Sequence, residues 1–297
     1  MLSSAASARS QATVGILLMC VGIASLRISD AISKALTAGY PVIQILFIRN
    51  LIALPFAVFI ALKMGGVGAL RSYRPAAHLL RGVLWLLAAM IFFTSLKHLD
   101  IAEATALVFV APVFITAISA LFLKETVGWR RWLAVLAGFV GVLIVVRTGA
   151  GTFQSASVLP VITAVFYAVL MISARWVDPR ESVWTLMLYL VGAGALLSAL
   201  FAPFVWVGIQ AADIWMFLGI AIFGTAGITL ITQAFRFAPA ATVAPFEYSA
   251  LVWATFLGWF FWSEIPDMLT YVGAGVIILS GCYIVIREQQ IGEDKTD

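Results

Sequence analysis

Three charged residues lie at helical spacing inside an apolar stretch near the N-terminus. Arg27, Asp30 and Lys34 belong to the segment S25-L-R-I-S-D-A-I-S-K34 and are three and four residues apart. At ~100° per residue this spacing gathers them within about 60° of one helix face. Asp30 and Lys34 can pair as i and i+4. We expect Arg27, Asp30, Lys34 and Arg49 to form a charge cluster, with Lys34 as an anchor at the membrane interface and the other three as an outer gate or a structural clasp.

A single acid, Glu247, lies inside another apolar segment. A rise of ~1.5 Å per residue places it ~10 Å into the membrane from the cytoplasmic side. An acid at that depth costs several kcal/mol unless it is paired, hydrated or protonated. Glu247 is therefore a candidate for binding a substrate amine or carrying a coupling proton. Alternatively, it pairs with Arg236.

Polar and aromatic residues mark further helix faces. Thr105, Phe109, Pro112, Thr116 and Ser119 recur at steps of 4, 3, 4 and 3, which is one face of a helix. Such residues usually face the interior of a membrane bundle, although Thr hydroxyls often bond within or between helices and aromatic rings often fill space. The candidate substrate-binding residues are Trp85, Phe92, Phe109, Thr116, Tyr167, Thr229, Glu247, Tyr248, Trp253 and Thr255.

The composition requires that these faces lie in a membrane. Hydrophobic residues make up 63% of the 297 residues and charged ones only 11%, whereas soluble domains have about 25% charged residues. The sequence predicts an all-α membrane protein, since a span needs roughly 20 apolar residues. The ten predicted segments are 13–36, 41–62, 76–97, 102–123, 130–147, 157–175, 183–207, 211–234, 240–262 and 266–286.

Basic residues indicate how these segments are oriented. If the N-terminus is inside, thirteen Lys and Arg residues fall on the cytoplasmic side, and only Lys34, Lys97 and Arg147 fall on the other. Basic residues prefer cytoplasmic loops. Both termini are therefore predicted to be cytoplasmic.

The chain also contains a weak internal repeat. Lys97 and Arg236 are separated by 139 residues, and so are Glu125 and Glu264. At the same offset Tyr248 and Thr255 match Phe109 and Thr116. We therefore predict two five-helix repeats, at 13–147 and 157–286, followed by a tail at 287–297. Five is odd, so the second repeat must be inverted, as is typical of secondary transporters.

The layout resembles the drug/metabolite transporter superfamily in its ten-helix form, built from two EamA-type repeats. The resemblance rests on Lys34, Arg49, Pro112 and Glu125, and on A234-F-R-F-A-P-A-A with Glu264. The stretch A244-P-F-E-Y-S-A-L-V-W is similar to the aromatic amino-acid exporter branch. One departure is that Pro112 precedes Glu125 by 13 residues whereas Pro245 precedes Glu264 by 19. The proline bend therefore need not fall at equivalent depth in the two halves.

The resemblance implies a bacterial inner-membrane transporter that exports aromatic or other amino acids by alternating access. One alternative is an importer of a vitamin, a nucleoside-like compound or a methyl donor. Another is an intramembrane enzyme, which would need a clustered acid/base or metal-binding loop; no such sequence motif is present. We expect a small-molecule substrate, membrane lipid as the surroundings, and no cofactor, metal, catalytic residue or nucleic acid. The sequence is compatible with a monomer.

Overall fold

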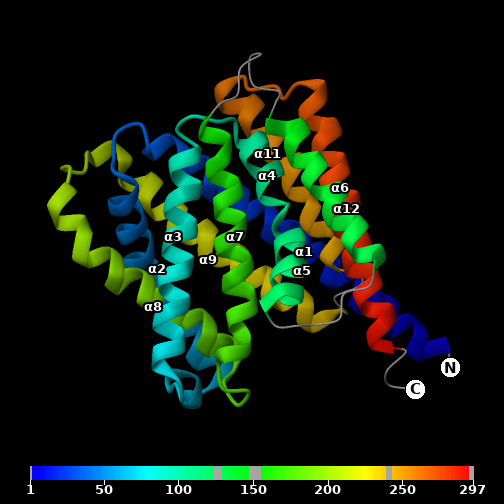
Figure 1. Cartoon of the computed structure of the whole chain (residues 1–297). Coiled ribbons are helices and arrows are strands. Elements are labelled where there is room, and N and C mark those ends of the chain that lie inside the picture. The colour runs from blue at the N-terminus through cyan, green and yellow to red at the C-terminus, as the bar shows by residue number, and fades with distance from the viewer. Residues whose placement is uncertain (1, 123–128, 147–154, 239–242, 294–297) are drawn as a thin grey trace.

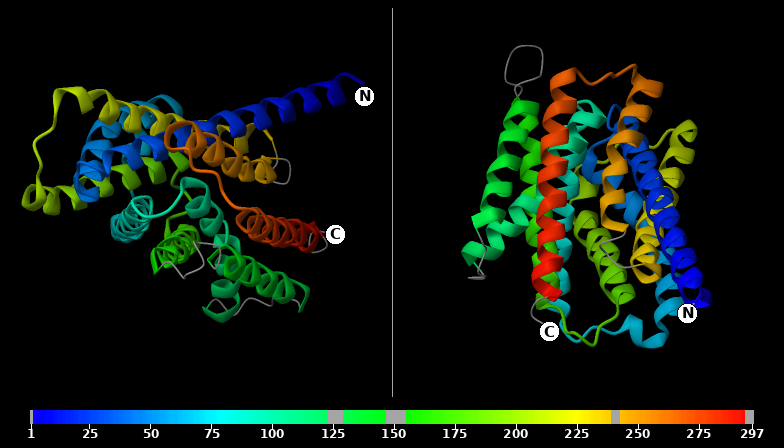
Figure 2. Two further views of the ribbon diagram at one scale, coloured as in Figure 1. Left: turned by 90° about the horizontal axis from the view of Figure 1, so that it is seen from above. Right: turned by 90° about the vertical axis from the view of Figure 1, so that its right-hand side faces the viewer.

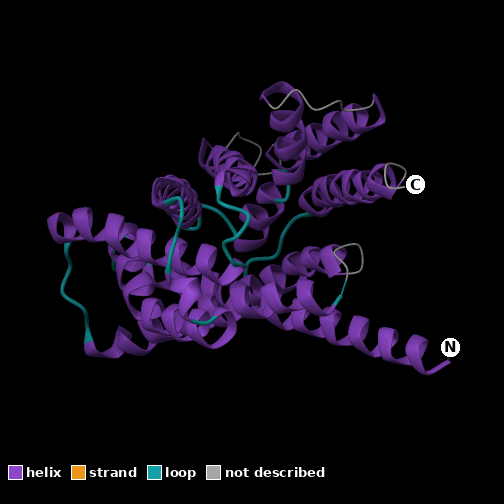
Figure 3. Cartoon of the chain, turned by 90° about the horizontal axis from the view of Figure 1, so that it is seen from below, coloured by secondary structure: helices purple, strands orange, loops and turns teal. Residues whose placement is uncertain are grey.

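Helices are the only regular secondary structure in the described residues. The computed structural model describes residues 2–122, 129–146, 155–238 and 243–293, and within these ranges no strand occurs (Figures 1 and 3). Glu125 and Arg147, which the sequence analysis used, lie outside the described residues. The beginning of α1 and the end of α12 lie at the same end of the bundle (Figure 1).

The elements follow one another through short connections. Pro41 precedes α2 with an extended backbone, and Pro75 opens α3 at a position where its missing N–H is not needed. Gly66, with φ 70°, ends α2. The elements are α1 (Leu2–Leu36), α2 (Val42–Gly65), η1 (Val67–Leu70), α3 (Pro75–Ser95), α4 (Ile101–Val108), α5 (Ala111–Phe122), α6 (Trp129–Val146), η2 (Ser155–Ser157), α7 (Val158–Ile172), η3 (Ser173–Trp176), α8 (Val183–Phe201), η4 (Ala202–Val205), η5 (Ala211–Asp213), α9 (Ile214–Phe237), η6 (Ala244–Tyr248), α11 (Ser249–Trp262) and α12 (Met268–Glu293).

Seven helical stretches of the described chain are long and apolar enough to cross a membrane. They are Thr13–Leu36, Val42–Gly65, Pro75–Ser95, Ile101–Leu121, Ser155–Ile172, Val183–Val205 and Ala211–Phe237. Trp132–Val146 and Met268–Tyr283 are shorter apolar helices. The predicted segment 240–262 contains η6 and the 14-residue α11. The prediction of ten spans therefore stays a prediction beyond these seven.

The helices pack in pairs that join the two halves of the chain. α1 packs against α9, α3 against α7, α2 against α8, α4 against α11, and α6 against α12. When each segment of one half is replaced by its counterpart in the other half, the α1–α9 pair becomes the α7–α3 pair, and the reverse. Each of the other three pairs consists of two counterparts and therefore stays the same. Figure 2 shows α3 and α7 nearly end-on, whereas the blue α1 runs obliquely.

Glycines permit two of these pairs to approach closely. A β-carbon on Gly227 of α9 would lie 2.8 Å from the carbonyl oxygen of Gly22 in α1. In α12, a β-carbon on Gly273 would lie 2.8 Å from the carbonyl oxygen of Gly141 in α6. Small residues let helix backbones pack in this way. The apolar α6 and α12 thus serve as scaffold.

One helical segment is interrupted at a position that matches a change of helix type in the other half. α4 ends at Val108 and α5 begins at Ala111, because Pro112 has no N–H to donate to Val108 and its ring clashes there. In the other half, the 3₁₀ turn η6 ends at Tyr248, 139 residues after Phe109, and α11 follows. The two prolines differ in position, as their unequal spacing from Glu125 and Glu264 allowed: Pro245 opens the 3₁₀ turn, whereas Pro112 follows the interruption between α4 and α5.

A buried cluster around Glu181 joins the start of α3 and the connection before it to the loop before α8. The carboxylate of Glu181 lies 2.5 Å from His78 Nε2 and accepts hydrogen bonds from Ser72 Oγ at 3.0 Å and Tyr73 N at 2.7 Å. The side chains of His78 and Glu181 are almost fully shielded from solvent. Burial raises the pKa of Glu181, but the hydrogen bonds from His78, Tyr73 and Ser72 outweigh it and hold the pKa below its usual value.

Glu181→Gln is expected to lower the melting temperature by roughly 3–6 °C at neutral pH. The exchange replaces charge-assisted hydrogen bonds by neutral ones at a cost of about 1–2 kcal/mol. The lowered pKa means that the carboxylate stabilises the fold above about pH 4.3 and loses this effect as the pH falls through the folded-state value. Thermal unfolding of both proteins between pH 3 and 8 measures this; a difference that persists unchanged in acid contradicts it.

Candidate functional site

Arg27 and Asp30 form an ion pair inside the bundle. Arg27 Nη1 lies 3.0 Å from Asp30 Oδ2 and also donates to Thr105 Oγ1 of α4 at 3.2 Å. Asp30 is 9% exposed. The predicted pair of Asp30 with Lys34 is wrong, because the carboxylate turns to the arginine one turn earlier.

Lys34 belongs to a separate contact at the end of α1. Its ammonium donates to the Glu264 carboxylate and to the Leu99 carbonyl at 2.9 Å. Glu264 Oε2 in turn accepts from Ile101 N at 3.3 Å, at the start of α4. Lys34 therefore lies outside the charge cluster, since its long side chain reaches the connection after α11 instead of Asp30.

Arg49 of α2 lies against aromatic rings. Its guanidinium carbon is 5.3 Å from the centre of the Trp85 ring and 5.9 Å from that of Phe93. Among the described residues, no hydrogen bond from this guanidinium is formed, and its nearest opposite charge is Asp30, with which it interacts electrostatically. The structure thus brings Arg27, Asp30 and Arg49 together.

Glu247 stands apart from Arg236. The Arg236 guanidinium lies 5.9 Å from the Trp184 ring centre, and no ion pair joins it to Glu247 within the described residues. The Glu247 side chain is exposed, although it lies in the helical turn η6. The Tyr167 hydroxyl interacts electrostatically with both Glu247 and Arg27. Glu247, Tyr167 and Arg27 therefore share one region between the two halves.

Phe109 and Tyr248, which occupy matching positions, meet at the two helix interruptions. Their ring centres are 5.1 Å apart at an interplanar angle of 81°, an edge-to-face contact. The Tyr248 hydroxyl lies against Gly281 of α12, where a β-carbon would clash with it. This contact joins the interruption between α4 and α5 to the junction of η6 and α11.

The other candidates are more dispersed. Thr116 and Thr229 donate to the carbonyls four residues earlier, at 3.0 and 2.8 Å, so their hydroxyls are used within their own helices. Thr255 Oγ1 is buried without a partner in the described structure. Phe92 packs next to Phe93, and Trp253 is 36% exposed beside Phe256. The structure does not gather Thr116, Thr229, Thr255, Phe92 and Trp253 around one site.

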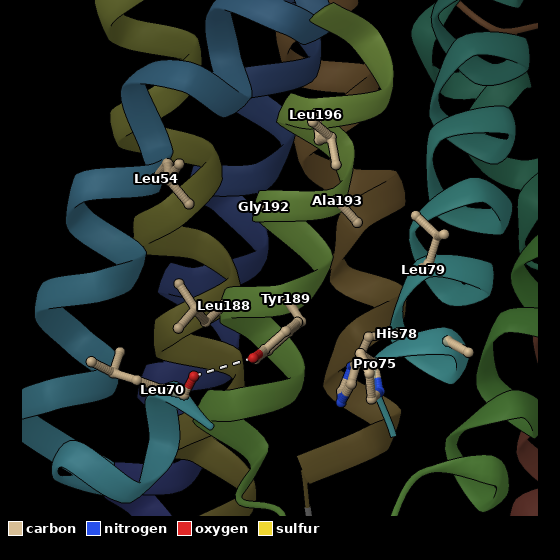
Figure 4. Close-up of a pocket in the computed structure, with 11 residues that line it drawn as sticks. Leu54, Leu70, Pro75, His78, Leu79, Leu188, Tyr189, Gly192, Ala193 and Leu196 are labelled. Atoms are coloured by element: carbon tan, nitrogen blue, oxygen red, sulfur yellow. Dashed lines mark hydrogen bonds between the residues drawn. The ribbon is translucent and has the colours of Figure 1, made fainter. Parts of the chain in front are cut away.

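An apolar groove lies between α2, α3 and α8 (Figure 4). Its volume is about 540 Å³. Its polar side chains are engaged, since His78 contacts Glu181 and the Tyr189 hydroxyl donates to the Leu70 carbonyl at 3.1 Å. None of the predicted substrate-binding residues lines it. The lining of this groove is therefore mainly apolar, and both of its polar side chains already have a partner.

A smaller, enclosed cavity lies beside Arg49. It is lined by Arg49, Trp85 and two residues absent from the candidate set, Asn50 and Thr225. The sequence signal for Asn50 was its position directly after Arg49 in an apolar helix. In the described chain, no group of three or more His, Cys, Asp or Glu residues could hold a metal.

The comparisons with known proteins agree with this architecture. The model of the EamA-like transporter family matches residues 13–147 and 154–287. The alignment with one solved structure covers 90% of this chain and 96% of the chain in that structure. Its TM-score of 0.61 at 19% identity shows a shared fold.

Relatives of known name are similar over nearly their whole length. A riboflavin transporter of Rhizobium johnstonii is 30% identical, covering 95% of this chain and 94% of its own. The pseudopaline exporter of Pseudomonas aeruginosa is 27% identical, covering 93% and 97%. The S-adenosylmethionine uptake transporter of Rickettsia prowazekii is 25% identical, covering 95% of each. This chain is a multi-span membrane transporter, and it belongs to the EamA-like transporter family, as the drug/metabolite transporter resemblance predicted.

Proposed function

We propose that this protein is a secondary transporter that moves small metabolites by alternating access, with aromatic or other amino acids as its cargo. It crosses the bacterial inner membrane ten times, with both termini in the cytoplasm. Its two halves, 13–147 and 157–286, are inverted repeats that rock about the region between them.

One observation carries this proposal: the segment that holds α4 and α5 is interrupted at Phe109, the matching residue Tyr248 lies at the junction of η6 and α11, and the two rings touch. Broken helices at a repeat interface are typical of the substrate sites of secondary transporters. The equivalence of the α1–α9 and α3–α7 pairs under exchange of the two halves also supports a repeat architecture of this kind.

Glu247 supports an amine-bearing cargo. It is the neighbour of Tyr248 at the break, its side chain is exposed, and it is not neutralised by Arg236. An ammonium group is the natural partner of such a carboxylate. An aromatic side chain such as Tyr167 gives a flat solute a large apolar contact area. Aromatic amino acids are therefore the first cargo to test.

The relatives favour a second candidate, the uptake of a vitamin or methyl donor, because two are named for riboflavin and for S-adenosylmethionine. The relatives are named for both export and uptake, so the test is counterflow, which does not depend on direction. Purified protein in liposomes preloaded with L-tryptophan, L-phenylalanine or L-threonine should accumulate the labelled amino acid above protein-free liposomes. Counterflow of labelled riboflavin or S-adenosylmethionine alone establishes the second candidate. No amino-acid counterflow at all overturns the proposed cargo.

A further inference from the structure

The enclosed cavity beside Arg49 lies where four helices from both halves meet. α2 contributes Arg49 and Asn50, α3 contributes Trp85, α8 contributes Val191, and α9 contributes Thr225. Its volume is about 40 Å³, and a cavity needs roughly 10–15 Å³ by this measure to hold one water. The space thus fits water or a group of a few atoms.

Asn50 presents an unused donor to this cavity. The side chain is 1% exposed, and its Nδ2 atom has no hydrogen-bond partner in the described structure. Leaving a buried donor unpaired costs about 1–3 kcal/mol. An acceptor that enters the cavity would remove this cost.

Arg49 presents an unpaired positive charge at the same place. Arg27 holds Asp30 at 3.0 Å, and two arginines with one aspartate leave one positive charge uncompensated in the cluster. The Arg49 guanidinium rests on Trp85 and, within the described chain, makes no hydrogen bond. A planar guanidinium binds a carboxylate through two parallel N–H donors.

Two glycines leave the space that these donors occupy. A β-carbon on Gly194 of α8 would lie 2.8 Å from Asn50 Nδ2, and one on Gly224 of α9 would lie 3.2 Å from Arg49 Nη2. Glycine inside a helix costs about 1 kcal/mol relative to alanine. Both donors thus depend on backbone positions without a side chain.

We infer that this cavity is a carboxylate-binding subsite, in which Arg49 and Asn50 hold the carboxylate of the transported solute. Trp85 and Val191 provide apolar contacts for the atoms next to that group. The inference rests on the proposed function, because it assigns the second charged group of an amino-acid cargo to residues of the transporter.

The test compares acids with their amides by ligand-induced thermal stabilisation of the full-length protein in detergent. The probes are L-tryptophan, L-phenylalanine and L-methionine, each beside its amide, which lacks the carboxylate. The wild type should bind at least one acid roughly tenfold or more tighter than its amide, as expected for a charge-assisted hydrogen bond. Equal binding of all three pairs, or no binding of any acid, overturns the inference.

Variants assign the preference to these two residues. Arg49→Gln should abolish the difference between acid and amide, and Arg49→Lys should retain only part of it because the two parallel donors are lost. Arg180→Gln, at an exposed arginine of the α7–α8 loop, is the matched control and should bind as the wild type does. A folded Arg49→Gln protein that still prefers acids overturns the inference.

Asn50→Leu separates ligand binding from a structural role. Removing an unpaired buried donor should raise the melting temperature of the ligand-free protein while weakening acid binding about threefold to tenfold. A structural asparagine would show a lower melting temperature and unchanged binding, which would contradict the assignment. Acid-selective binding without amino-acid counterflow would overturn the transport proposal and leave the carboxylate subsite intact. Amino-acid counterflow without a preference for acids over amides would overturn the subsite and leave the transport proposal intact.

Discussion

Glu247→Gln is expected to lower L-tryptophan counterflow at subsaturating concentration about 10- to 100-fold. The substitution keeps the size of the side chain but removes the charge that pairs with the substrate ammonium, and such charge-assisted hydrogen bonds contribute about 1.5–3 kcal/mol. Proteoliposomes that contain equal amounts of folded wild type and variant measure the effect. Asp178→Asn, which removes a carboxylate paired with the exposed Arg180 in the α7–α8 loop, is the control and should leave transport unchanged.

The same variant distinguishes amine binding from proton transfer. If Glu247 binds the amine, Glu247→Gln raises the KM for L-tryptophan, and the loss is similar with and without a pH gradient. If Glu247 carries the coupling proton, exchange persists and only the response to a pH gradient is lost. Unchanged transport in both assays excludes Glu247 from either role.

The helices were predictable because membrane segments are constrained by local composition. The predicted segment 13–36 coincides with the apolar stretch Thr13–Leu36, and 130–147 is within one residue of α6 at each end. The break before Pro112 follows from proline chemistry alone. The change from η6 to α11 at Tyr248 was not predicted, because nothing in the sequence fixes where a 3₁₀ turn gives way to an α-helix.

The partners of the charged residues could not be predicted from spacing. Asp30 and Lys34 satisfy the i, i+4 rule, yet Lys34 pairs with Glu264, 230 residues away in sequence. A lysine side chain has many rotamers, so tertiary placement decides which acid it meets. Asn50 was missed for a related reason: its significance lies in an unpaired donor, which exists only once the surrounding helices are packed.

Asp30→Asn is expected to destabilise the protein more than any other single change in the charge cluster. It leaves Arg27 and Arg49 in the bundle without an acid, and removing one partner of a buried pair costs about 3–5 kcal/mol. The melting temperature should fall by roughly 10 °C. Asp178→Asn is again the control, since its partner Arg180 is exposed to water and their pair should contribute far less.

The double variant Arg27→Met/Asp30→Leu tests whether the cost arises from unpaired charge. Apolar residues of similar volume often replace a buried ion pair without loss of stability, so the double variant should melt above Asp30→Asn even though it carries two changes. Counterflow of the double variant then separates the two roles predicted for the cluster. If the cluster is only a structural clasp, the double variant transports as the wild type does; if it is a gate, transport stays impaired although stability has returned. A double variant that melts no higher than Asp30→Asn would contradict the charge argument, because the loss would then come from packing around Asp30 and Thr105 instead of from the arginines.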